Sequence, residues 1–112
     1  MKLAFFKLLL TISLLFTPSL LLAHDVDYLN EAVSNTSEGI AEGRAGDVDD
    51  MMEYLQNARD YAISAQSIQK NRHIKIAIHH LKSAINHAQF NNISGAIKDA
   101  GLALLHLNYV NK

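Results

Sequence analysis

Three histidines in the second half of the chain recur at one spacing. His73, His80 and His87 are each seven residues apart. Seven residues make two turns of an α-helix, less a drift of about 20°, so we expect the three imidazoles along one side of one helix. Imidazole is the side chain that proteins use most often to bind transition metals. The spacing therefore predicts either a metal site or the half-exposed polar edge of a helix.

One helix cannot bring these histidines to a single ion, because residues seven apart are separated by about 10.5 Å along the axis. Further ligands must come from a neighbouring helix. If the next helix packs antiparallel, Asp99 lies level with the gap between His80 and His87. His106 then lies level with the gap between His73 and His80. Such nitrogen and oxygen ligands suit copper, nickel or zinc, and intrinsic affinity favours copper.

The elements that must position these side chains show an internal duplication. Four twelve-residue windows align, at 32–43, 51–62, 77–88 and 96–107; the windows of each pair are offset by 19 residues, and the two pairs by 45. Positions 1, 5, 8 and 12 of the windows are mostly small or apolar, which is the periodicity of a helix with a broad apolar face. The regular offsets indicate a helical hairpin that has been duplicated.

Capping residues divide the windows into separate helices. Asp47, Asn71 and Asn92 are good N-caps, and Gly43 and Gly46 end the first helix. Short loops between paired helices make neighbours antiparallel. We predict an all-α fold, an antiparallel up-down four-helix bundle of two duplicated hairpins. The helices are expected at about 26–43, 48–67, 72–90 and 93–109.

The first 23 residues have the pattern of a secretory signal peptide. Two lysines precede a short apolar stretch, and Ala23 offers a small residue for cleavage. We expect removal of 1–23 and a bundle over 24–112 in the periplasm or outside the cell, without membrane attachment. A retained anchor is the alternative, although the apolar run is shorter than the ~20 residues that span a bilayer. Cleavage after Ala23 would leave His24 with a free amine beside its imidazole, a pair that chelates Cu(II), unless this end is simply frayed.

Composition narrows the function further. The chain has no cysteine, which excludes disulfides and thiolate metal sites. Residues 24–66 hold ten acids and two bases, and residues 67–112 hold six bases and one acid, so the halves carry about −8 and +5. We expect these halves to pack together. A nucleic-acid partner is disfavoured because the mature chain is acidic overall and exported. The sequence shows neither a nucleophile–base pair nor a phosphate loop, so we do not expect an enzyme.

The segments NEAV, EGIAEGRAGD, HLKSAINHA and AIKDAGLALLHL, in this order and spacing, resemble the periplasmic small metal-binding proteins. The resemblance covers nearly the whole mature chain. It implies a short exported four-helix bundle with a histidine-rich heptad that binds several copper, nickel or zinc ions. It assigns ligand positions to His73, His80, His87 and His106. Other positions where the family tends to place histidine hold Asn35, Glu42, Asp47, Tyr54, Tyr61, Asn92 and Asp99. These substitutions predict a lower metal capacity or a changed role.

We therefore predict a protein that sequesters or buffers one or two divalent transition-metal ions. The predicted ligands are His73, His80, His87, His106 and Asp99, with His24 as a further Cu(II) ligand. The alternative is an exported bundle that binds no metal and contacts a protein partner through its charged halves or exposed edge. A haem-binding bundle is a weaker alternative, because the chain has methionines but no Cys-x-x-Cys-His attachment site.

Overall fold

The computed structural model describes residues 26–111, and this part of the chain consists of helices joined by short turns. The helices are α2 (Tyr28–Arg44), α3 (Val48–Ile68), α4 (Arg72–Gln89) and α5 (Ile93–Val110). The described range contains no strand. The predicted all-α class is confirmed, and the expected helix ends agree to within two residues. The expected signal peptide and His24 lie outside the described residues.

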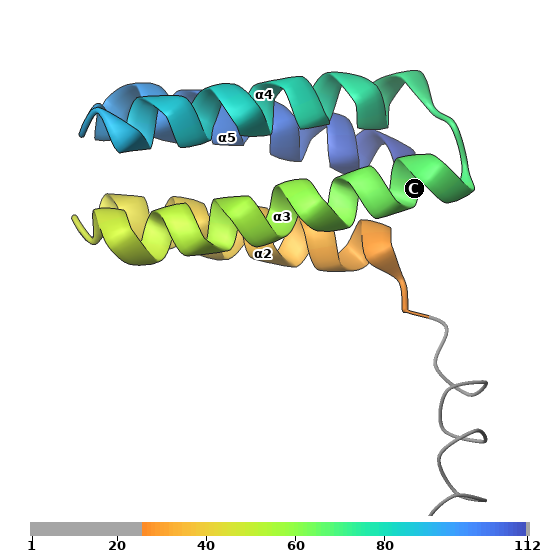
Figure 1. Cartoon of the computed structure of the whole chain (residues 1–112), viewed down its shortest axis with the longest axis horizontal. Helices are drawn as coiled ribbons and strands as arrows, with labels where there is room; N and C mark the ends of the chain where they lie inside the picture. Colours follow the sequence, from red (N-terminus) through yellow and green to blue (C-terminus); the bar gives the residue numbers. More distant parts are fainter. Residues whose placement is uncertain (1–25, 112) are drawn as a thin grey trace, which may run out of the picture.

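The four helices form two antiparallel hairpins that pack into one bundle (Figure 1). Helix α2 packs against α3, and α4 packs against α5. The hairpins meet through α3 with α4 and through α2 with α5. This is the predicted up-down arrangement, in which each helix lies beside the one that precedes it in the chain. No helix within residues 26–111 is both long and apolar enough to cross a membrane.

Each helix begins at an aspartate or asparagine. The N-caps are Asp27, Asp47, Asn71 and Asn92, and the side chain of each accepts a hydrogen bond from a backbone N–H in the first turn. These bonds satisfy donors that a helix leaves unpaired at its start. The three predicted caps are confirmed, and Asp27 adds a fourth that the sequence reasoning did not single out.

The duplication extends to the backbone of the two hairpin turns. The turn between α2 and α3 holds Gly46 at a φ of 86°, and the turn between α4 and α5 holds Asn91 at a φ of 59°. These residues are 45 positions apart, the same offset as that between the hairpins. Glycine and asparagine are the residues that adopt this left-handed conformation most readily. The two hairpins therefore turn in the same way on different residues.

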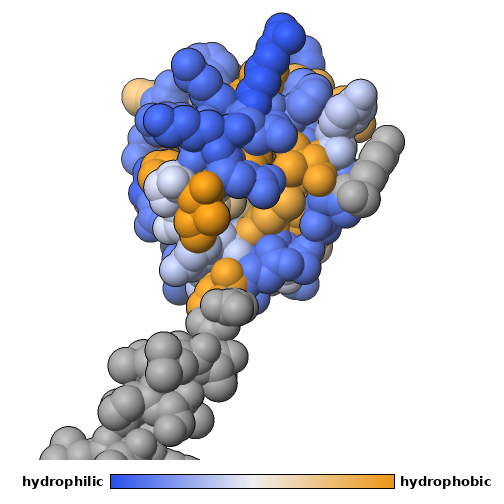
Figure 2. Space-filling model, turned by 90° about the vertical axis from the view of Figure 1, so that its right-hand side faces the viewer, coloured by the Kyte–Doolittle hydropathy of each residue, from blue (hydrophilic) through white to orange (hydrophobic). Residues whose placement is uncertain are grey.

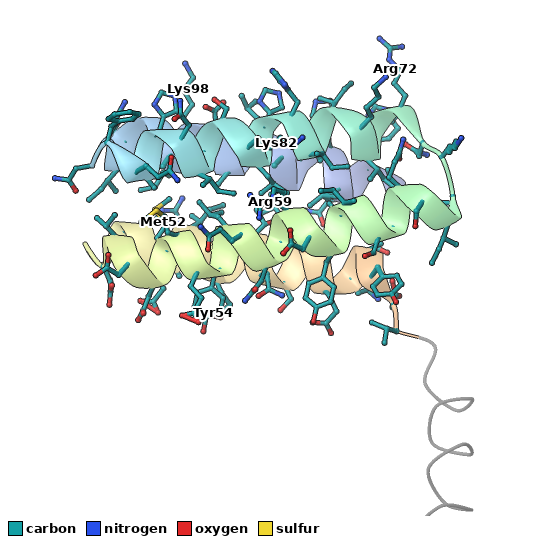
Figure 3. The ribbon with its side chains drawn as sticks, viewed as in Figure 1. Met52, Tyr54, Arg59, Arg72, Lys82 and Lys98 are labelled. Atoms are coloured by element: carbon teal, nitrogen blue, oxygen red, sulfur yellow. The ribbon has the colours of Figure 1, made fainter. Side chains whose placement is uncertain are left out.

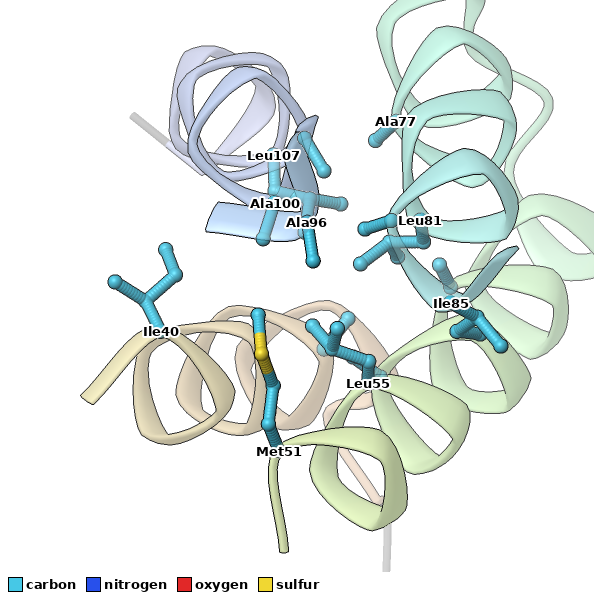
Figure 4. Close-up of a cluster of buried hydrophobic side chains, with 14 of the residues drawn as sticks. Ile40, Met51, Leu55, Ala77, Leu81, Ile85, Ala96, Ala100 and Leu107 are labelled. Atoms are coloured by element: carbon cyan, nitrogen blue, oxygen red, sulfur yellow. The ribbon is translucent and has the colours of Figure 1, made fainter. Parts of the chain in front are cut away.

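Small side chains dominate the core. Window positions 1, 5, 8 and 12 are buried in all four helices. Alanine fills many of them, and the larger fully buried side chains include Met51, Leu55, Leu81 and Leu107 (Figure 4). Close approach leaves no room at Gly43, where an added Cβ would lie 2.6 Å from Met51 Sδ. A tightly packed core of this kind fixes the relative position of α4 and α5.

The oppositely charged halves form opposite layers of the bundle. Figure 3 shows Arg72 and Lys98 of the α4–α5 layer pointing away from the α2–α3 layer. The layers do pack together as expected. Among the described residues, however, no ion pair joins them: the ion pairs are Arg59 with Asp60, and Asp99 with two histidines of its own hairpin. The hairpins are held to each other mainly by the apolar core.

Candidate metal centre

Five of the six predicted metal ligands meet where α4 packs against α5. We call this set the histidine seam; it consists of His73, His80, His87, Asp99 and His106. His73 Nδ1 lies 3.0 Å from His106 Nδ1. His80 Nδ1 lies 3.3 Å from Asp99 Oδ1, and His87 Nε2 lies 3.3 Å from Asp99 Oδ2. The antiparallel register thus places Asp99 between His80 and His87, as the sequence predicted.

His106 lies between two histidines of α4. Its ring centroid is 5.3 Å from that of His73 and 6.0 Å from that of His80, with interplanar angles of 27° and 12°. The ring of Tyr109 lies against that of His73, with the two centroids 4.2 Å apart. The seam therefore contains a short stack of three imidazoles that ends on a tyrosine.

The Nδ1 atoms of His73 and His106 form a hydrogen bond in the metal-free structure, and their separation also suits a shared ion that would replace the bridging proton. Two nitrogens bound to one ion at about 2.0–2.1 Å lie about 2.8–3.4 Å apart for bond angles between about 90° and 109°. The observed 3.0 Å falls within this range. The nitrogen lone pairs lie in the ring planes, so binding requires some rotation about χ2, which is a soft torsion for histidine.

The surroundings of His106 favour the neutral imidazole. Burial lowers the pKa of His106 below its ordinary value, and the neighbouring His73 and His80 lower this pKa further. A metal binds the unprotonated nitrogen of histidine. At neutral pH His106 therefore has the protonation state that a ligand needs.

Asp99 is held by three side chains of α4. Ser83 Oγ donates a hydrogen bond of 2.7 Å to Asp99 Oδ2. Burial by itself raises the pKa of Asp99, but the hydrogen bonds from Ser83 and His80 and the charges on His80 and His87 outweigh it, and the pKa lies below its ordinary value. Asp99 is therefore an ionised carboxylate at neutral pH. The sequence reasoning missed Ser83, although it lies one turn after His80 on the same flank of the helix.

Asn92, expected from the sequence as a helix cap at a position where the family tends to place histidine, also contacts the seam. Its Oδ1 accepts the hydrogen bond from Gly95 N–H, and its Nδ2 lies 3.0 Å from His87 Nδ1. The side chain of Asn92 thus links the start of α5 to the last histidine of α4.

The first hairpin places different chemistry at the matching positions. Tyr28 and Tyr61 correspond to His73 and His106 at the 45-residue offset, and their ring centroids lie 6.3 Å apart. The duplication therefore preserves the contact between these two positions while changing the side chains. Among the described residues, imidazoles occur only on α4 and α5.

An acidic cluster lies at the turn between α2 and α3. In the described range, Glu42, Asp47 and Asp50 form the one set of three potential ligands whose atoms all lie within 4.8 Å of one another. The ligands of the histidine seam meet in pairs rather than as such a triple. Asp47 caps α3 by accepting from Asp50 N–H, the role that its position predicted. Its charge and hydrogen bond are the main reasons why the pKa of Asp50 is raised.

A surface pocket lies at the end of the bundle where α2 begins. Figure 2 views the end of the bundle where the chain enters α2, and it shows apolar side chains among hydrophilic ones. Val26, Tyr28, Ile68 and Val110 line a pocket at this end. Its lining includes no histidine, so we do not assign the metal chemistry to it.

Comparison with protein families places the chain in one of them. A family model described as small metal-binding protein matches residues 2–110. The match confirms the resemblance noted in the sequence and includes every residue of the histidine seam. The description refers to metal binding and names no reaction. No curated protein matches the chain.

Proposed function

Because the chain belongs to the small metal-binding protein family, we propose that it binds copper, nickel or zinc at the histidine seam. The observation that carries this proposal is the 3.0 Å separation between His73 Nδ1 and His106 Nδ1. Neutral imidazoles are good ligands for these three metals, and copper leads in intrinsic affinity. The ring of His80 stacks on that of His106, with the centroids 6.0 Å apart.

The seam suits reversible binding better than a structural role. Closed structural zinc sites have four protein ligands, whereas the ligands of the seam meet in pairs. Its side chains remain accessible; that of His80 is 24% exposed and that of His87 is 38% exposed. The buried core contains none of these side chains. We therefore propose a buffering or sequestering protein that carries one or two ions and releases them readily.

The proposed location is the periplasm or the outside of the cell. Its support is the signal-peptide pattern of residues 1–23. Export would expose the protein to metal ions entering the cell envelope. His24 becomes a further Cu(II) ligand only if cleavage occurs directly before it.

Calorimetric titration of the purified protein with Cu(II), Ni(II) and Zn(II) tests the proposal. We expect saturable binding in the micromolar range or tighter, and its loss in the double variant with His80→Ala and His106→Ala. His79→Ala is the matched control, because His79 is an exposed histidine of α4 outside the seam, whose ring meets that of His80 edge-on at a centroid distance of 5.9 Å. Unchanged binding in the double variant would exclude the seam. Absence of binding in the wild-type protein would favour the alternative of an exported partner-binding bundle.

A further inference from the structure

The hydrogen bonds of the seam determine which histidine nitrogens are available to a metal. An ionised carboxylate only accepts hydrogen bonds, so His80 Nδ1 must donate to Asp99 Oδ1. In neutral His80 the proton therefore lies on Nδ1, and Nε2 has a free lone pair. No described residue makes a hydrogen bond to His80 Nε2. His80 thus presents one unoccupied ligand atom.

His87 has the opposite arrangement. The hydrogen bond from Gly95 N–H fixes Asn92 Oδ1, so the group that faces His87 Nδ1 at 3.0 Å is the Asn92 amide nitrogen. This nitrogen donates, and His87 Nδ1 accepts. The proton of neutral His87 therefore lies on Nε2, which is 3.3 Å from Asp99 Oδ2. Both ring nitrogens of His87 already face protein groups.

Asp99 is similarly occupied. One oxygen accepts from His80, and the other accepts from Ser83 at 2.7 Å and faces His87. A metal on either oxygen would displace one of these contacts. The carboxylate has a side-chain exposure of only 17%, which further limits access.

The backbone at Gly95 supports the contact between Asn92 and His87. A Cβ at this position would lie 2.7 Å from Asn92 Nδ2 and 2.9 Å from His87 Nδ1. Glycine therefore leaves room for the contact, whereas Asp50 has a side chain at the matching position of the first hairpin. That hairpin also has Tyr54 in place of Asp99. The arrangement belongs to the second hairpin alone.

We propose that His73, His106 and His80 Nε2 are the metal ligands of the seam, with His73 and His80 on different ions, whereas Asp99 and His87 are positioning residues. This inference rests on the proposed metal binding at the seam. A carboxylate that accepts from the outer N–H of a ligating histidine fixes the ring orientation and makes the other nitrogen more basic. Asp99 does this for His80. Ser83 and His87 contact Asp99, and Asn92 in turn contacts His87. Asp99 and His87, which the sequence analysis predicted as ligands, thereby act through His80.

Counting the imidazoles on bound Cu(II) by pulsed electron paramagnetic resonance separates ligands from positioning residues. We expect His80→Ala and His106→Ala each to reduce the number of Cu(II)-bound imidazoles per protein by one. His87→Gln and Asp99→Asn are expected to leave the count unchanged and to weaken Cu(II) binding by about 10- to 100-fold. Asp99→Ala should weaken it more than Asp99→Asn, which retains an acceptor for His80. His79→Ala should change neither quantity.

The variant Asn92→Ser tests the positioning role of His87 without removing the N-cap of α5. Serine keeps the helix cap but removes the amide that donates to His87, so we expect weaker binding with an unchanged count. A count that falls by one in His87→Gln makes His87 a ligand and overturns the inference, even if metal binding itself stands. A wild-type protein without Cu(II)–imidazole signals overturns both this inference and the proposed function.

Discussion

In the folded chain, His73 Nδ1 lies 3.0 Å from His106 Nδ1, although the two residues are 33 positions apart. The antiparallel packing of α4 on α5 produces this contact. The matching contact of the first hairpin joins Tyr28 to Tyr61. The same packing geometry therefore brings together two imidazoles in one hairpin and two phenol rings in the other.

This correspondence provides a matched pair of variants. We expect His106→Ala to weaken Cu(II) binding by at least ~10-fold, because it removes a proposed ligand. Even the loss of a residue that only supports a ligand typically lowers metal affinity by about this factor. Tyr61→Phe, at the duplicated position, should leave binding unchanged. Isothermal titration calorimetry measures both. Equal losses in the two variants would show that the effect is one of folding rather than coordination.

Acid should destabilise the metal-free protein through His106. The folded-state pKa of His106 is below its ordinary value of 6.5, so the unfolded chain takes up the proton first as the pH falls. The contribution of neutral His106 is fully present above pH 6.5 and decreases below it. We expect the midpoint of thermal unfolding, followed by circular dichroism without metal, to fall between pH 7 and pH 5. A smaller decrease in His106→Gln is expected, and an equal one would contradict this origin.

Metal should stabilise a fold that does not require it. The buried core of residues 26–111 contains none of the proposed metal ligands, so we expect a chelator to leave the helical circular dichroism unchanged. Metal at about 100 times its dissociation constant adds about 2.7 kcal/mol to the free energy of unfolding, which raises the melting temperature by on the order of 10 °C for a domain of this size. Loss of helix on chelation would instead indicate a structural metal.

Two helical glycines should respond oppositely to alanine. Gly43→Ala forces a Cβ to within 2.6 Å of Met51 Sδ, and we expect a loss of about 1–3 kcal/mol, as for other overpacked cores. Gly101 has nothing within 4 Å of an added Cβ, so Gly101→Ala should stabilise the protein by up to about 1 kcal/mol through helix propensity. Urea denaturation measures both changes. A gain of stability in Gly43→Ala would show that Met51 repacks easily.

The sequence alone predicted the helices, three of their four caps and the antiparallel register. These features depend on local signals: apolar spacing selects the buried face, Asp47 and Asn92 begin helices, and the 45-residue offset repeats one hairpin. Short loops fix the register of paired helices, so the sequence also predicted that His106 lies level with the gap between His73 and His80. The substitution of tyrosine, asparagine and acid for histidine in the first hairpin was visible directly.

Tertiary structure decided which atom of each side chain faces which partner. That His80 turns Nδ1 toward Asp99, and that Asn92 turns its amide nitrogen toward His87, depends on rotamers and on the rotation of α4 and α5 about their own axes. Alanine packing and the absence of a Cβ at Gly95 set these rotations. Residue spacing describes positions along a helix and contains no information about ring orientation, so the separation of ligands from their supporting residues required the packed pair of helices.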